Sequence, residues 1–326
     1  MSNLPKSVDI RDDTMREGLQ IESRDIPVTE KLRLLDALGE TGLKTISIGS
    51  FAHPKWTPQM ACIDEIAEKF VPKPGITYTA SVFNQRGFER ADAYYPKIDV
   101  RTRRAVTHVE LSDIFARRNY NRTRDEQIDA MDGIIERARL DGVAAGAVTL
   151  GAPFGSNFEG DFTMEQRLWL LEKMIDRWHE HGFTVKSCSL IDAMGWDMPD
   201  QVRATLSTIR NRWPEITDFH CHFHNTRGTA MTSYYEALQQ GAQSFDTCLG
   251  GMGGCPYCGN GRAAGHVPTE DFTFMCQEMG IETGRDLEAL SECARLAEDI
   301  VGHPLPGSVM KGGSLQSYRD KLAGTA

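Results

Sequence analysis

The stretch 217–249 reads TDFHCHFHNTRGTAMTSYYEALQQGAQSFDTCL, and it decides the fold. An apolar, strand-like run over 217–224 is followed by a helical pattern over 228–240 and by a second strand-like run over 244–249. A strand, a helix and a strand in this order predict a βαβ unit with parallel strands.

The same alternation continues along the chain. Further strands are predicted over 8–10, 44–51, 76–83, 104–111, 144–150 and 184–191, and further helices over 29–38, 123–140, 163–181 and 198–210. Thr163 and Gln166 form a predicted capping box at the start of one of these helices. Eight strands that alternate with helices predict a (β/α)₈ TIM barrel, with a doubly wound sheet as the alternative.

Polar residues at the ends of the predicted strands favour the barrel, because barrel enzymes collect their chemistry there. These residues are Arg16-Glu17, Ser50, Asn84, Ser112-Asp113, Asp192, His222 and His224, and Gly250-Gly251. We expect a single domain, with the barrel over about 5–265 and a helical C-terminal extension over about 268–326.

The composition is that of an ordinary soluble globular protein. The chain has 326 residues, of which 25% are charged, and a net charge of −10. An acidic chain without a basic run is not expected to bind nucleic acid or an anionic membrane in general. The sequence shows no signal peptide and no apolar run long enough to span a membrane, so we expect a cytoplasmic protein whose eight cysteines are reduced.

The strongest local signal is the segment Asp218-Phe-His-Cys-His-Phe-His-Asn225. Residues two apart in a strand point to the same face, so His220, His222 and His224 share one. Alternating imidazoles at the mouth of a barrel favour a metal site, and hydrogen-bonded core histidines are the alternative.

A second signal, Asp13-Thr-Met-Arg-Glu-Gly-Leu-Gln20, directly follows the first predicted strand. The carboxylate of Glu17 can complete a His/His/carboxylate metal site. The adjacent Arg16 supplies a rigid fork of donors for a carbonyl or carboxylate. A surface ion pair is the alternative interpretation.

A third signal is the glycine-rich segment 250–266, which follows the eighth predicted strand. Such a loop can bind phosphate through backbone N–H groups or close over an active site. It contains Cys255-Pro-Tyr-Cys258, so a thiol redox protein is an alternative of a different class. Redox pairs of this kind normally open a helix early in a small thioredoxin-like unit, which disfavours that alternative.

Together these segments resemble the 3-hydroxy-3-methylglutaryl-CoA (HMG-CoA) lyase branch of the metal-dependent TIM-barrel lyases and Claisen synthases, the DRE-TIM metallolyase superfamily. The resemblance runs from about Val8 to Gly284. Further segments match in the family's order, namely Ser50–Met60, Ser112–Phe115 with Asn119 and Asn121, Leu150–Gly155, Asp192–Gly195, His222–Gly228, Gly250–Tyr257 and Thr269–Asp271.

The resemblance implies roles for individual residues. Arg16, Asp192 and Cys255 would be catalytic: Arg16 at the acyl oxygen, Asp192 near the 3-hydroxyl and Cys255 as the thiol that moves a proton. The implied metal ligands are Glu17, His222, His224 and His266, and the implied substrate-binding residues are Gln20, Ser47, Thr226 and Arg227.

The implied reaction is cleavage of a carbon–carbon bond in a 3-hydroxy-3-substituted dicarboxylic acyl-CoA, giving an acyl-CoA and a keto acid or ketone. Alternatives are a condensing acyltransferase like homocitrate or isopropylmalate synthase, and a metal-containing barrel without lyase chemistry. The resemblance also implies a small-molecule acyl-CoA partner and a homodimer or larger homo-oligomer.

The sequence departs from the family pattern at three positions. Glu17 replaces the lyase branch's usual aspartate, Ser47 stands where a glutamate of the second strand is usual, and His266 aligns with an asparagine after about two extra residues. The family implies Mg²⁺ or Mn²⁺ as the cofactor. Coordination by His266 would favour Zn²⁺, Co²⁺ or Fe²⁺, because imidazole nitrogen suits transition metals better than magnesium.

Overall fold

The computed structural model describes residues 4–101, 105–259 and 265–324. It divides into two compact units. The central unit consists of Met1–Pro5, Val100–Asp246 and Gly254–Ala264. The terminal unit consists of Lys6–Asp99, Thr247–Gly253 and Gly265–Ala326. The prediction of one domain stays a prediction.

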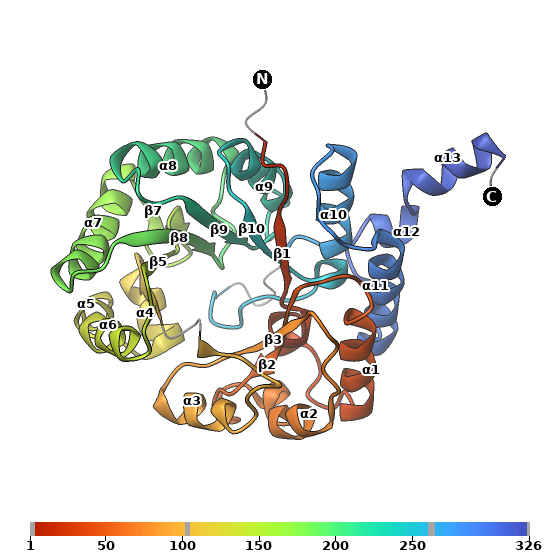
Figure 1. Cartoon of the computed structure of the whole chain (residues 1–326), viewed down its shortest axis with the longest axis horizontal. Coiled ribbons are helices and arrows are strands. Elements are labelled where there is room, and N and C mark those ends of the chain that lie inside the picture. Colours follow the sequence, from red (N-terminus) through yellow and green to blue (C-terminus); the bar gives the residue numbers. More distant parts are fainter. Residues whose placement is uncertain (1–3, 102–104, 260–264, 325–326) are drawn as a thin grey trace. The chain divides into compact units, whose positions relative to one another are not determined.

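The terminal unit contains three parallel strands, β1 (Asp9–Asp12), β2 (Thr45–Ser50) and β3 (Thr77–Ser81), with β2 in the middle. Helices α1 (Val28–Leu38), α2 (Ile63–Lys69) and α3 (Gln85–Asp92) accompany them on the outer side (Figure 1). Four further helices end the chain: α10 (Thr269–Glu278), α11 (Leu287–Val301), α12 (Val309–Gly312) and α13 (Leu315–Ala323).

The central unit contains β4 (Val106–Glu110), β5 (Gly146–Gly151), β8 (Val185–Asp192), β9 (Asp218–Phe223) and the first residues of β10 (Ser244–Thr247), parallel and hydrogen-bonded in that order. Its helices are α4 (Asp113–Tyr120), α5 (Arg124–Asp129), α6 (Met131–Leu140), α7 (Met164–Glu180), α8 (Pro199–Arg212) and α9 (Ala230–Gln239). A short antiparallel hairpin, β6 (Gly155–Ser156) with β7 (Gly160–Asp161), follows β5.

Local sequence explains how α7 packs. Thr163 caps the helix in a capping box with Gln166, as predicted, so two of the free N–H groups at its start are satisfied. Its buried face ends at Trp178, whose indole N–H donates to Thr107 Oγ1 at 2.9 Å. A Cβ atom at Gly146 would lie 2.5 Å from the Trp178 ring, so only glycine lets β5 approach the helix this closely.

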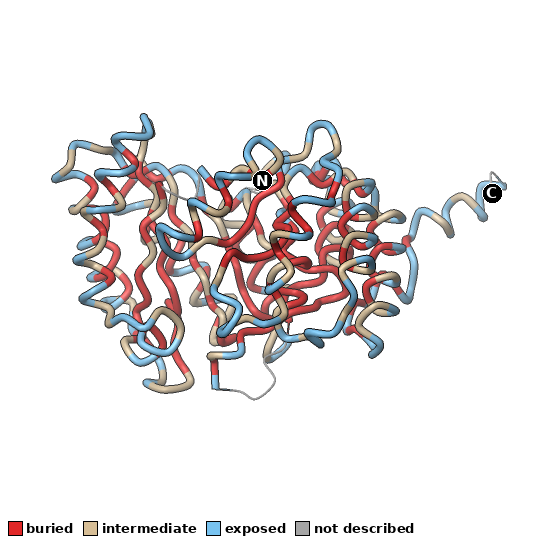
Figure 2. The backbone as a smooth tube through the Cα atoms, turned by 90° about the horizontal axis from the view of Figure 1, so that it is seen from below, coloured by how far each residue is buried: buried red, intermediate tan, exposed pale blue. Residues whose placement is uncertain are grey.

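Within each unit the strands are buried along most of their length, and the helices alternate between buried and exposed turns (Figure 2). This pattern is the one expected of parallel strands covered by amphipathic helices. No helix of the described residues has the length and apolar composition needed to cross a membrane.

All eight predicted strands are present, although Arg104 of one of them lies outside the described residues. The helical prediction after residue 267 is confirmed by α10 to α13. The prediction of one continuous helix over 123–140 is wrong. The segment forms two helices, α5 and α6, which meet at Ala130. Helices α2, α3 and α4 were not predicted, because at 7 or 8 residues each they are too short for a periodic pattern to stand out.

Candidate metal centre and active site

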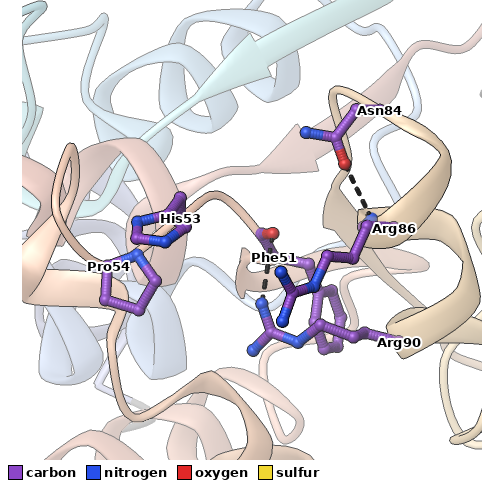
Figure 3. A pocket seen from close by; sticks show the side chains of 7 residues that line it. Phe51, His53, Pro54, Asn84, Arg86 and Arg90 are labelled. Atoms are coloured by element: carbon purple, nitrogen blue, oxygen red, sulfur yellow. Dashed lines mark hydrogen bonds between the residues drawn. The ribbon is translucent and has the colours of Figure 1, made fainter.

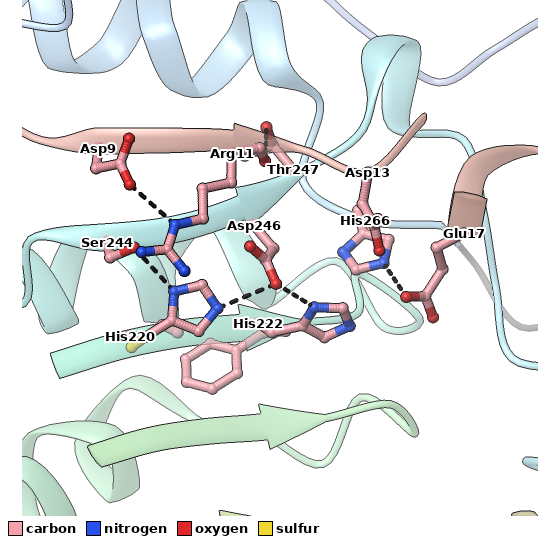
Figure 4. Close-up of polar contacts among 12 residues, drawn as sticks. Asp9, Arg11, Asp13, Glu17, His220, His222, Ser244, Asp246, Thr247 and His266 are labelled. Atoms are coloured by element: carbon pink, nitrogen blue, oxygen red, sulfur yellow. Dashed lines mark hydrogen bonds and ion pairs between the residues drawn. The ribbon is translucent and has the colours of Figure 1, made fainter. Parts of the chain in front are cut away.

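In the central unit, two histidines of β9 point toward one carboxylate of the neighbouring strand. His220 Nε2 lies 3.0 Å and His222 Nδ1 lies 2.9 Å from Asp246 Oδ2, and His220 Nδ1 lies 2.9 Å from Ser244 Oγ (Figure 4). Parallel pairing of β10 with β9, with Ser244 opposite His220, brings these side chains together. The predicted shared face of His220 and His222 is therefore confirmed.

The contact with Asp246 fixes the state of His222. Burial raises the pKa of the Asp246 carboxyl, but the charge and hydrogen bonds of the two histidines outweigh it and hold this pKa well below its usual range. When the ring of His222 is neutral, donation of its Nδ1–H to this carboxylate places the lone pair on Nε2. A histidine held in this way is the usual form of a metal ligand.

His224 follows directly after β9 and is fully buried. Its ring lies 5.4 Å from that of His222, measured between centroids, and its backbone N–H donates to the Asp192 carbonyl at 3.0 Å. The central unit thus presents two neighbouring imidazoles, one of them oriented by a carboxylate.

In the terminal unit, Arg16 and Glu17 lie on a π-helical turn, Thr14–Gly18, directly after β1. The Asp13 carbonyl accepts from the backbone N–H groups of Arg16, Glu17 and Gly18. Turns of this rare type often occur at functional sites. The turn brings the Arg16 guanidinium into contact with the carboxylates of Glu17 and Asp13.

Glu17 also pairs with a histidine that is distant in sequence. His266 Nε2 lies 3.4 Å from Glu17 Oε2, and both side chains are buried (Figure 4). The backbone N–H of His266 donates to the Met252 carbonyl at 3.0 Å, which fixes this residue beside the glycine-rich segment. The intervening residues 260–264 lie outside the described part of the chain.

A buried carboxyl, Asp12, joins the segments that carry this pair. It accepts from the backbone N–H of Thr14 at 3.0 Å, and its Oδ2 lies 3.0 Å from Thr14 Oγ1 and 2.9 Å from Thr269 Oγ1. Thr269 Oγ1 in turn lies 2.8 Å from Thr247 Oγ1. Burial raises the pKa of Asp12 to about 7. These contacts hold the Arg16–Glu17 turn against the start of α10, three residues after His266.

The predicted catalytic Asp192 ends β8 and organises the loop that follows it. Its two carboxylate oxygens accept from the backbone N–H groups of Met194 at 3.0 Å and Trp196 at 2.6 Å. Burial raises the pKa of this carboxyl. Arg227, predicted to bind substrate, donates to the carbonyls of Met194 and Gly195 at 2.9 Å each, so it braces the same loop.

The predicted catalytic thiol, Cys255, lies in an apolar cluster of the central unit. Cys255 and Cys258 pack with Phe115, Ala152 and Met194. Neither cysteine forms a disulfide, and Cys258 Sγ lies 3.0 Å from the Ala193 carbonyl oxygen. The backbone N–H of Cys258 donates to the Cys255 carbonyl at 3.3 Å, so the two residues close a tight turn.

The remaining predicted substrate-binding residues belong to different units. Gln20 is half-buried in a 3₁₀ turn, Leu19–Ile21, and Ser47 is buried in β2, both in the terminal unit. Thr226 is half-buried after β9 in the central unit. Its side chain would lie 2.6 Å from a Cβ atom at Gly195, where φ is +67°, so this position requires glycine.

Comparison with known proteins identifies the family. The family model described as HMGL-like matches residues 7–297. The chain belongs to this family. It is 34% identical to hydroxymethylglutaryl-CoA lyase YngG of Bacillus subtilis, over 93% of this chain and 96% of the relative. It is also 34% identical to (R)-citramalyl-CoA lyase of Chloroflexus aurantiacus, over 94% and 95% of the two chains.

A solved structure of HMG-CoA lyase from Bacillus subtilis matches this HMGL-like chain with a TM-score of 0.80 and 32% identity, covering 97% of this chain and 99% of that one. The predicted family, the (β/α)₈ fold class and the enzyme class, a carbon–carbon lyase, are thereby confirmed.

The donor set of this HMGL-like chain suits a divalent cation. Glu17, His222, His224 and His266 are buried and each offers one ligand atom. Three imidazoles and one carboxylate are ligands that zinc, cobalt, iron and manganese accept in proteins. The residues present therefore fit a metal site, while the identity of the ion is left open.

Two residues of this site were not predicted from the sequence. Asp246 could have been found, because it occupies the middle of a predicted strand where a carboxylate is unusual. Asp12 gave a weaker signal, since Asp13 follows it and either one could have ended the first strand.

Proposed function

We propose that this chain is a divalent-metal lyase that cleaves a 3-hydroxy-3-substituted dicarboxylic acyl-CoA into an acyl-CoA and a keto acid or ketone. In this proposal Glu17 and His266 of the terminal unit and His222 and His224 of the central unit are the ligands of one ion. The relatives named for HMG-CoA and citramalyl-CoA support the choice of an acyl-CoA.

The observation that carries the proposal is the contact between His222 and Asp246. A carboxylate that accepts the Nδ1–H of a neutral imidazole selects the tautomer with its lone pair on Nε2, the tautomer that binds a metal. What distinguishes His222 from His220, which contacts the same carboxylate, is that His222 lies in the buried cluster with Glu17, His224 and His266.

When bound, the metal would supply Lewis-acid polarisation of the substrate oxygens. The protein residues then divide the remaining work. Cleavage moves the C2–C3 electron pair onto C2, so negative charge develops on the thioester oxygen as an enolate forms. We assign Arg16 to this oxygen, because Glu17 and Asp13 hold its guanidinium in place and its positive charge can stabilise a developing oxyanion.

Two proton transfers complete the reaction. The 3-hydroxyl loses its proton as C3 becomes a carbonyl carbon, and we assign Asp192 to this end of the substrate. The backbone N–H groups of Met194 and Trp196 hold the Asp192 carboxyl in place at the end of β8. We assign Cys255 as the donor of the proton that C2 receives, since its thiol can act as a general acid.

Ser47 bears on the choice of substrate. It replaces the family's usual glutamate on the second strand, and its buried Oγ has no hydrogen-bond partner among the described residues. A neutral hydroxyl cannot balance the positive charge of Arg16 as a carboxylate would. We therefore propose a 3-hydroxy acyl-CoA other than HMG-CoA as the substrate.

Condensation is the second candidate, favoured by Glu17. A glutamate after the arginine is the residue that resembles the homocitrate synthase branch rather than the lyase branch. The same residues would serve in reverse, with the thioester enolate attacking a keto acid.

One screen tests both directions. The purified protein is incubated with Mg²⁺, Mn²⁺, Co²⁺ or Zn²⁺ and either candidate 3-hydroxy acyl-CoAs or acyl-CoA plus keto acids, and products are identified by mass spectrometry. Formation of a shorter acyl-CoA with a keto acid or ketone supports cleavage. Consumption of free acids alone, with no change in any CoA thioester, would refute the CoA assignment.

Assembly and location are further proposals. We propose a homodimer or larger homo-oligomer in the cytoplasm, as the sequence and the family resemblance lead us to expect. Light scattering coupled to size-exclusion chromatography tests the assembly, and a single-chain mass in solution would contradict it.

A further inference from the structure

A pocket of about 240 Å³ opens between the loops that follow β2 and β3 in the terminal unit (Figure 3). It is lined by Phe51, His53 and Pro54 from the first loop and by Asn84, Arg86, Gly87 and Arg90 from α3 and the residue before it. This volume is below the range of about 300–1,000 Å³ that is usual for pockets holding a whole drug-sized ligand. The pocket therefore suits a small group.

The polar side chains of this pocket are donors. Asn84 Oδ1 accepts from the backbone N–H of Gly87 at 2.9 Å, so its amide NH₂ is the part left for a ligand. His53 Nδ1 accepts from the backbone N–H of Lys55 at 3.2 Å, so its proton lies on Nε2. None of the lining residues is a carboxylate. Such a lining favours an anion over a cation.

Two guanidinium groups add positive charge on one side of the pocket (Figure 3). Arg90 pairs with Asp64 and donates to the Phe51 carbonyl at 3.4 Å, so it is held in place and partly neutralised. Arg86 is exposed and has no ion-pair partner among the described residues. The charge that the pocket leaves uncompensated is therefore mainly that of Arg86.

The start of α3 adds to this field. Asn84 caps the helix, and the residues that follow it lie at the positive end of the helix dipole. The charge of Arg86, the part of the Arg90 charge that Asp64 leaves uncompensated and the helix N-terminus together exceed one unit, so they match a doubly charged phosphoryl group better than a singly charged carboxylate.

We infer that this pocket binds a phosphoryl group. The pocket and the proposed catalytic Arg16 follow neighbouring strands of the terminal unit. Arg16 follows β1 and His53 follows β2, and these two strands are parallel. The phosphate can come from the nucleotide part of an acyl-CoA, an assignment that rests on the proposed function, or from a free small phosphate, which does not rest on it.

Isothermal titration calorimetry with CoA, pantetheine and inorganic phosphate tests the inference without any turnover. Arg86→Gln removes the charge and keeps a polar side chain, and Arg33→Gln on α1 of the same unit is the matched control. One lost charge-assisted hydrogen bond corresponds to roughly tenfold in affinity. We expect Arg86→Gln to weaken CoA or phosphate binding by about this factor and Arg33→Gln to leave both unchanged.

The pattern of results identifies the source of the phosphate. Weaker CoA binding with unchanged pantetheine binding would assign the pocket to the nucleotide phosphates. Weaker binding of inorganic phosphate alone would assign it to a separate small phosphate. Equal affinities of Arg86→Gln and wild type for CoA and for phosphate would overturn the inference, provided that circular dichroism shows both proteins folded. Because only binding is measured, an inactive protein would refute the lyase proposal without affecting this result.

Discussion

The two pairs of candidate metal ligands are built in different ways. His222 and His224 of the central unit lie on and directly after a regular strand, and a carboxylate of the next strand orients His222. Glu17 and His266 of the terminal unit lie on a π-helical turn and beside a glycine-rich segment. Their positions depend on side-chain contacts around Asp12 rather than on a strand ladder.

This difference shows that backbone pairing alone can position one pair of ligands, whereas the other pair needs side-chain contacts. Strand pairing fixes the spacing of the histidines to within the repeat of the sheet. The turn that carries Glu17 has no such ladder, so buried hydroxyl and carboxyl groups must supply the order. Variants that alter the contacts of one pair and leave those of the other unchanged can test strand pairing and side-chain contacts separately.

Removal of a donor from either pair should have the largest effect. Glu17→Gln and His222→Gln keep the size of the side chain and remove its charge or its ring nitrogens. If both donors serve one ion, each should lower kcat/KM by about 10⁴-fold, the equivalent of several kcal/mol of lost Lewis-acid stabilisation. Steady-state kinetics with metal in excess measure the loss. Full activity of either variant would remove that residue from the site.

Cys255→Ala should remove chemistry without removing metal. A lost general acid lowers kcat by roughly 10²- to 10⁴-fold, while the metal content should stay at the wild-type level because the thiol is not a ligand. Cys258→Ser is the control, since a dithiol mechanism needs both cysteines. Loss of metal from Cys255→Ala would make this residue a ligand, and equal losses in both variants would point to the redox alternative.

The sequence predicted the strand-borne part of the site from periodicity alone. The alternation of His220 and His222 places them on one face, and the structure confirms it. Glu17 and His266 were paired only through the family resemblance, because residues 249 apart in the chain give no local signal. The role of Asp12 was not visible either, since its partners Thr14, Thr247 and Thr269 meet only after folding.

Asp246→Asn tests the support of the strand-borne pair. The amide can still accept the Nδ1–H of His222 but carries no negative charge, so His222 becomes a weaker donor to a metal. Loss of such a partner lowers metal affinity or activity by about 10- to 100-fold. Ser244→Ala, which removes only the contact with His220 Nδ1, is the control and should change metal affinity by less than about threefold. Equal metal affinities of Asp246→Asn and wild type would contradict the role of Asp246 in supporting His222 as a ligand.

Asp12→Asn tests the support of the other pair through the pH dependence of stability. Burial raises the pKa of Asp12 from 3.8 to about 7. The folded state therefore holds this proton more tightly than the unfolded state, so its contribution favours folding at low pH and is lost as pH rises from about 4 to about 7. The free energy of unfolding is measured by urea denaturation at pH 5 and at pH 7.5, with EDTA present. It should fall less between these two pH values in Asp12→Asn than in wild type.

Asp9→Asn provides the matched control for this experiment, because Asp9 begins the same strand with an exposed carboxylate. The free energy of unfolding of Asp9→Asn should change with pH as it does in wild type. A loss of stability in Asp12→Asn as large as in wild type would mean that Asp12 is not the group responsible.

The most direct test of the whole account is a cobalt titration followed by absorption spectroscopy. We predict one Co²⁺ per chain, with d–d bands in wild type that weaken in His222→Gln and in Glu17→Gln, each with at least tenfold lower affinity. His266→Ala should also shift these bands, because it removes a nitrogen ligand. The claim that both pairs hold one metal would be contradicted if the variants of one pair kept the wild-type affinity and spectrum while the variants of the other pair lost the ion.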